Sequence, residues 1–258
     1  MAGLIGAEAR RTFLQYRRYP FESVSSMVVL VMIFLGLFLG ASYLAGVPIR
    51  GPHLSAVVLG YVIWTVAMAA VSDMGFELQN EAQNGTLEQV FLTPQSTGLI
   101  MLVRDAVSVV FFLVPMAVIL VVLALLTGAR LVVSPLDLVP LALCLITAWG
   151  LGLVVAAGAV LLKRLNQVLN LLQFLLLFVI MAPIAQLPGA WHAVAAVLPL
   201  EGAVGLLNHL MVPGPIGPGS GALLLEAAIN AALWLAAGAW LFARADGLAR
   251  SRGILAHY

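Results

Sequence analysis

Charged residues are scarce in this chain. Only 9% of its 258 residues are Asp, Glu, Lys or Arg, whereas 63% are hydrophobic. A soluble domain carries about 25% charged residues, so the composition indicates an integral membrane protein. The formal net charge is +1, and no basic patch alternates with aromatic residues. Nothing in the sequence therefore favours nucleic acid as a partner.

Lysine and cysteine each occur once. Lys163 stands in Leu161-Leu162-Lys163-Arg164, where no glycine precedes it. A P-loop needs a lysine after a glycine-rich turn to hold nucleotide phosphates, so we expect this chain to bind no ATP itself. Cys144 lies inside an apolar run. The sequence therefore offers no disulfide framework and no cysteine-based metal site, and Cys144 is expected to be a small hydrophobic residue.

Side chains for chemistry within the membrane are also missing. The histidines all fall outside the predicted spans: His53, His192, His209 and His257. Asp73, Arg104, Asp105 and Glu226 lie near span ends, and no span interior holds an acidic pair. An intramembrane enzyme needs a nucleophile with a base, or clustered metal ligands. We therefore expect no catalytic residue, no metal site and no enzyme activity of the chain's own, and ion-coupled transport is disfavoured.

Apolar runs dominate what is present. A helix needs about 20 apolar residues to cross the hydrocarbon, and six segments are long enough. They are 24–46, 54–74, 98–127, 138–162, 168–186 and 222–243, the fifth being short. The sequence predicts one all-α membrane domain over residues 1–258.

Lysine and arginine set the predicted orientation. With the N-terminus in the cytoplasm, ten of them fall inside and only Arg50 and Arg130 outside. Positive charge is enriched on the cytoplasmic side, so this arrangement is favoured. Six spans then put both termini in the cytoplasm, in the inner or plasma membrane.

Two segments outside the spans are predicted to be helical and to meet the membrane. Residues 1–22 predict an interfacial amphipathic helix, with Ile5, Ala9, Thr12, Phe13 and Tyr16 on one face and Glu8, Arg11 and Arg18 on the other. Pro20 would turn the chain into the first span. Residues 187–221 hold apolar pieces of about ten residues between prolines, which are too short to cross. They predict short re-entrant helices near the outer surface.

The loop 75–97, between the second and third spans, contains an unusual helix signal. Asp73, Glu77 and Glu81 recur every four residues, which places them on one face of a helix. This spacing predicts that the second span continues as a helix into the cytoplasm. Asn84-Gly85 predicts a helix end, and Thr86 with Gln89 predicts a new start by the capping-box pattern. Leu87, Val90 and Phe91 form one apolar face before Pro94 ends the element. A helix this short is unstable alone, so it must dock on the chain's own spans or on a partner protein.

The same loop carries a family resemblance. Glu81, Gly85-Thr86-Leu87-Glu88 and Thr93-Pro94 resemble the loop of ABC-2 type permeases, the membrane subunits of type V ABC exporters. The expected plan, with an amphipathic helix, six spans and re-entrant helices between spans five and six, is similar too. One departure is Asn84, where many members have a basic residue, which puts a salt bridge to the ATPase in doubt.

The resemblance implies that transport and ATP hydrolysis are carried out by separate subunits. It implies a coupling helix that docks on a separate ABC ATPase through Glu81, Leu87, Glu88, Val90 and Phe91. It also implies two ATPase copies, which bind ATP and Mg, and a second copy of this chain, all at the lipid membrane.

The resemblance also implies that the transport path or the dimer interface lies at spans one and five. The residues expected there are Phe34, Gly36, Phe38, Gly40, Asn166, Asn170, Gln173 and Phe174. The Gly36–Gly40 spacing permits close helix approach, either to a second copy or within one chain. The span-five amides could line a vestibule or bond neighbouring helices.

The cargo is the least defined expectation. Aromatic residues are few in spans one and five, which favours a hydrophobic or amphipathic cargo such as a drug, natural product or lipid. The alternatives are a polysaccharide or glycolipid permease of the same family, and a carrier that needs no ATPase.

Overall fold

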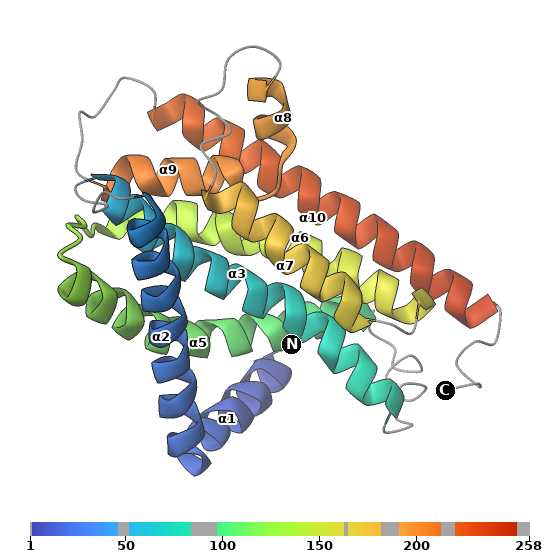
Figure 1. The fold of residues 1–258 in the computed structure, drawn as a ribbon. Coiled ribbons are helices and arrows are strands. Elements are labelled where there is room, and N and C mark those ends of the chain that lie inside the picture. Colours follow the sequence, from blue (N-terminus) through green and yellow to red (C-terminus); the bar gives the residue numbers. More distant parts are fainter. Residues whose placement is uncertain are drawn as a thin grey trace.

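The structure is a computed structural model that describes residues 2–45, 52–83, 97–162, 165–181, 191–212 and 220–251. All regular elements in these ranges are helical (Figure 1). The elements are α1 (Ala2–Arg18), α2 (Pro20–Ala45), α3 (Pro52–Gln83), α5 (Thr97–Thr127), the 3-10 turn η1 (Pro135–Asp137), α6 (Leu138–Leu162), α7 (Leu165–Met181), α8 (Trp191–Val197), α9 (Glu201–Met211) and α10 (Ser220–Ser251). The predicted all-α membrane class is confirmed.

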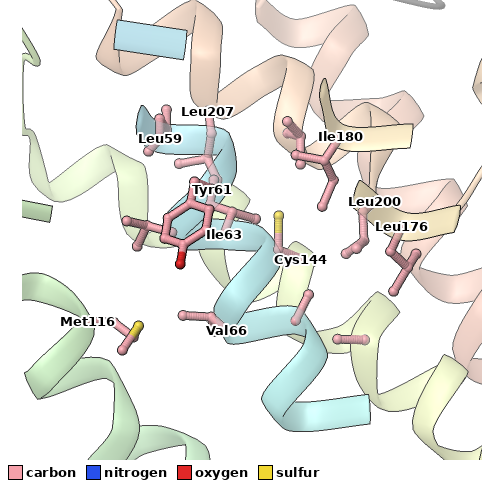
Figure 2. Packing of buried hydrophobic residues seen from close by; sticks show 14 of the residues in the cluster. Leu59, Tyr61, Ile63, Val66, Met116, Cys144, Leu176, Ile180, Leu200 and Leu207 are labelled. Carbon is pink, nitrogen blue, oxygen red and sulfur yellow. The ribbon is translucent and has the colours of Figure 1, made fainter. Parts of the chain in front are cut away.

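Helix α3 occupies the middle of the bundle and packs against α5, α6, α7 and α9. Its segment 56–71 is largely apolar on all sides, as a helix surrounded by other helices requires. In Figure 2, Tyr61, Ile63 and Val66 of α3 lie near Met116 of α5 and Cys144 of α6, all within one buried cluster. The single cysteine is thus a buried free thiol in the core.

Helices α6 and α10 form the most extensive helix pair. They approach so closely that a Cβ atom at Gly150 would collide with the backbone of Trp234 and Leu235. Small residues allow such crossings because the two backbones can touch.

Within the described ranges, five helical segments are long and apolar enough to cross a membrane: α2, α3, α5, the η1–α6 segment and α10. The predicted fifth span corresponds to α7, which has 17 residues in the described part of the chain. At 1.5 Å per residue, α7 is about 25 Å long, slightly less than the hydrocarbon thickness. The sixth span therefore stays a prediction.

Helix α3 has 32 residues and α5 has 31. Both are about 47 Å long, well beyond the ~30 Å of hydrocarbon. Helix α3 includes Asp73, Glu77 and Glu81, as the four-residue acidic spacing predicted. The helices thus project beyond the hydrocarbon or tilt within it.

Tyr19 is the one non-helical residue between α1 and α2, and Pro20 is the first residue of α2. Proline suits the first helical turn because its missing N–H needs no partner there. Helix α2 lies at the edge of the bundle and touches it with one side, so that little of its apolar surface is buried (Figure 1). Its outer faces are thus free to meet lipid or another protein.

Two short helices, α8 and α9, lie in the region predicted to contain re-entrant segments, and α10 fastens the first of them. The buried Asn230 amide donates to the carbonyl oxygens of Ala196 at 2.8 Å and Leu198 at 3.0 Å. The Trp234 indole donates to Val197 O at 3.1 Å. These bonds satisfy carbonyls that the end of a helix leaves without partners.

Candidate functional site

The predicted ATPase-docking segment lies almost entirely outside the described residues. Leu87, Glu88, Val90 and Phe91 fall in the gap 84–96, and of Glu81 only the helical backbone of α3 is described. The two helices that flank the gap are described. Helices α3 and α5 pack against each other, so any force on residues 84–96 acts on a joined pair of long helices.

One arginine joins three helices near that gap. Arg104 of α5 donates from Nη1 to Glu77 Oε1 of α3 at 2.9 Å. Its Nε lies 3.2 Å from Glu8 Oε1 of α1. Glu8 also meets Arg11 of its own helix at 3.5 Å. We call Glu8, Glu77 and Arg104 the three-helix ion cluster.

Burial strengthens the three-helix ion cluster. The side chains of Arg104, Glu77 and Glu8 are 24%, 25% and 14% exposed. Ion pairs this far removed from water are screened less than surface pairs. The planar guanidinium can serve two carboxylates at once, which a lysine cannot do with the same geometry. The cluster therefore fixes α1 against the α3–α5 pair.

Two further contacts reinforce this junction. Ser108 Oγ of α5 donates to Asp73 Oδ2 of α3 at 3.2 Å. The Tyr16 ring of α1 stacks on Phe111 of α5, with centroids 6.4 Å apart. Burial, and then the nearby charge of Asp73, raise the pKa of the Tyr16 hydroxyl above its usual value. Tyr16 is therefore a neutral packing residue at ordinary pH.

Sequence reasoning found the members of the cluster but not their contacts. The sequence places Glu8 on the polar face of the interfacial helix, and Arg104 near a span end and on the cytoplasmic side, with no partner predicted for either. The available signal was charge within helices that are otherwise apolar, because such groups usually find a partner on a neighbouring helix. Which of the possible partners they choose depends on how α1, α3 and α5 pack.

On α2, the structure separates residues that were predicted together. Phe34 is 2% exposed and packs on Tyr61 of α3, with ring centroids 5.0 Å apart. Phe34 is therefore packed in the core of the single chain, and its part in a path or a dimer interface stays a prediction. Phe38 is half-buried and stacks on Phe34, with ring centroids 5.7 Å apart.

Gly36 and Gly40 lie on an exposed side of α2, with no described atom within 4 Å of a built Cβ. The small-residue spacing is thus not used for packing against the described part of the same chain. Its use against a second copy stays a prediction.

On α7, the predicted residues are mixed. Asn170 is exposed and Phe174 is 68% exposed. Gln173 is half-buried, and its backbone carbonyl accepts the Trp64 indole N–H at 3.1 Å. The side chain of Asn166 lies outside the described residues. Asn170 and Phe174, one turn apart, thus face away from the bundle, where lipid, cargo or a second copy could contact them.

Across the described ranges, no three His, Cys, Asp or Glu residues gather in a way that could hold a metal ion. The features above define a class of protein: an all-α, multi-pass membrane protein whose charged residues concentrate at the junction of α1, α3 and α5.

The comparisons with known proteins identify the family. The family model for ABC-2 type transporters matches residues 4–211. The chain therefore belongs to the ABC-2 type transporter family. Membership makes it the membrane permease of an ABC transporter, a transport domain without its own catalytic site, and implies an ABC ATPase as partner. A search of curated proteins finds no match.

Proposed function

We propose that this chain is the permease of an ATP-driven exporter, in which residues 84–96 dock on a separate ATPase in the cytoplasm. Both termini then lie in the cytoplasm, and the protein resides in the inner or plasma membrane. ATP and Mg bind to the ATPase, which is present in two copies below two copies of this chain.

The observation that carries the proposal is the three-helix ion cluster. Residues 84–96 connect α3 to α5, and Arg104 ties both helices to α1 at 2.9 Å and 3.2 Å. Closure of the ATPases would push on the loop, and a joined α1–α3–α5 unit would move as one body. Such rigid-body motion is how closure at one site opens or shuts a distant path.

The proposed cargo is hydrophobic or amphipathic, such as a drug, a natural product or a lipid. The exposed surfaces of α2 and α7 support this choice, because they are largely aliphatic and offer few rings for stacking on sugars. A polysaccharide or glycolipid cargo is the second candidate. A carrier that works without an ATPase is a third candidate, and the family match argues against it.

Co-purification tests the docking assignment. The chain is co-expressed with its ATPase, and Leu87→Asp and Phe91→Asp are each introduced. A charge on the predicted apolar face should abolish co-purification while the amount of permease in the membrane fraction stays unchanged. The matched control is Gln89→Glu, which adds the same charge on the opposite side of the predicted helix and keeps the capping-box pattern. If both face variants retain the ATPase at wild-type levels, the docking proposal is wrong.

A further inference from the structure

Asp105 of α5 is buried in an unusual way. It is 2% exposed, and neither of its carboxylate oxygens makes a hydrogen bond of ordinary geometry among the described residues, although the buried Trp149 indole N–H lies close enough to interact with it. A buried carboxylate without a partner is costly, so such a group in a native fold calls for an explanation. A ligand bound beside Asp105 would supply the missing partner.

Asp105 lines a cavity of about 520 Å³ between α1, α3 and α5. The cavity is lined by Glu8, Arg11, Thr12, Gln15, Asp73, Phe76, Glu77, Asn80, Arg104, Asp105 and Ser108. Four carboxylates thus face two guanidinium groups. Both arginines form ion pairs with Glu8 or Glu77. Asp73 and Asp105 are the other two carboxyl groups that line the cavity.

A second cavity of about 470 Å³ adjoins the first and shares Thr12, Gln15 and Ser108 with it. Its other lining residues are mostly aromatic or apolar and come from α1, α2 and α5; they include Tyr16, Tyr19, Met27, Leu30, Phe112 and Met116. An anionic chamber beside an aromatic one matches a molecule with a positive end and an apolar body. Aromatic faces also attract organic cations directly.

The volumes of the two cavities and the side chains that line them favour an organic ligand over a metal ion. Each cavity falls in the range of about 300–1,000 Å³ that is typical of small-molecule sites. The four carboxyl groups of the first cavity are not arranged so that three of them could hold one metal ion, and no such group occurs elsewhere among the described residues. A bare ion would leave most of either cavity unfilled.

We propose that these two cavities form a binding site for an amphipathic organic cation, with the positive group at Asp105 and Asp73 and the apolar body against Tyr16 and Phe112. The site lies within one copy of the chain, between α1 and the α3–α5 pair. The role of the bound cation as cargo rests on the proposed export function, whereas its binding does not.

Equilibrium dialysis of labelled tetraphenylphosphonium against the full chain in dodecyl maltoside tests the site, with empty micelles subtracted. We expect saturable binding of about one cation per chain and none of the similarly shaped anion tetraphenylborate. Asp105→Asn should weaken binding by at least about tenfold, because the charge that faces the cation is lost. Glu226→Gln removes a carboxylate from α10, away from both cavities, and should leave binding unchanged.

Two tryptophan substitutions on α1 test the site independently, in case Asp105→Asn fails to fold. Gln15 lines both cavities from α1, and Leu14 beside it is exposed and lines neither. Gln15→Trp should therefore weaken binding and Leu14→Trp should not.

The proposal is overturned if the wild-type chain shows no saturable binding, or if Gln15→Trp binds the cation as the wild type does. Tetraphenylborate that binds equally well also overturns it. The measurement uses neither ATP nor the ATPase. A failure here therefore leaves the co-purification result standing, and a failure of co-purification leaves the binding result standing.

Discussion

Gly238 of α10 packs directly against the carbonyl oxygen of Gly150 of α6, so that a Cβ atom built on Gly238 would overlap that oxygen. Neither residue bears a side chain, and the two helices use this to bring their backbones into contact. The pair fixes where α6 and α10 cross.

Gly238→Ala is expected to destabilise the protein by at least about 1–3 kcal/mol, because the added methyl group can fit only if the helices separate. The apparent melting temperature of the purified chain in detergent measures this. Gly247→Ala on the same helix is the control, since a Cβ there meets nothing within 4 Å. It should be neutral or slightly stabilising, by about 0.5–1 kcal/mol, because alanine favours helix. Equal melting temperatures for the two variants would contradict the close crossing.

The second prediction concerns the three-helix ion cluster. Arg104→Gln removes the charge that faces Glu77 and Glu8, and should cost about 1.5–3 kcal/mol of stability. Glu77→Gln alone should also destabilise, but it should add little once Arg104 is already Gln. A double-mutant cycle on the melting transition, with Arg17→Gln as an exposed control on α1, measures the coupling.

The cluster also has a functional readout if the export proposal holds. In the complex with the ATPase, Arg104→Gln should weaken the response of ATP hydrolysis to cargo more than it weakens complex formation. A variant that loses stability but keeps the full cargo response would assign the cluster a structural role alone.

The sequence predicted the helices well but not which sides of them meet. The apolar segment 138–162 is predicted to be a span, and the described residues Leu138–Leu162 are helical throughout, because the sequence there is one unbroken apolar run. The break before Pro20 was predicted from the geometry of proline alone. Both are local properties of the chain.

Contacts between distant residues could not be predicted in the same way. The family resemblance assigns Phe34 to a path or interface. Because α2 is apolar on every side, nothing in its own pattern shows which side faces α3. Gly150 and Gly238 are 88 positions apart in the chain, and only the packed structure brings them together. The docking residues Leu87, Glu88, Val90 and Phe91 were predicted from a local capping pattern, and they stay predictions.

Asn230 supports a third prediction. Asn230→Leu keeps the size of the side chain but leaves the carbonyl groups of Ala196 and Leu198 without their donor. The free energy of unfolding should fall by about 1–3 kcal/mol. Because the bonds hold the end of α8, hydrogen exchange should accelerate first in α8 and only later in α3.

Trp234→Phe provides the graded comparison for that prediction. It removes the one bond to Val197 O, at 3.1 Å, and should affect α8 less. If Asn230→Leu left exchange in α8 unchanged, the two bonds would contribute nothing to holding that helix.

The last prediction concerns the exposed side of α2. Gly36 and Gly40 have open space around them, so leucine at either position fits the single chain without a clash. If two copies pack through this side, as the export proposal expects, the larger side chain should keep the helices apart. Gly40→Leu should therefore shift the purified protein from dimer toward monomer in light scattering corrected for detergent, with an unchanged melting temperature for the monomer. Gly205→Leu, at an equally open position on α9, should leave the dimer intact. If both Gly36→Leu and Gly40→Leu dimerise as the wild type does, this side of α2 is not the interface. The exposed Asn170 and Phe174 of α7 would then be the next residues to test.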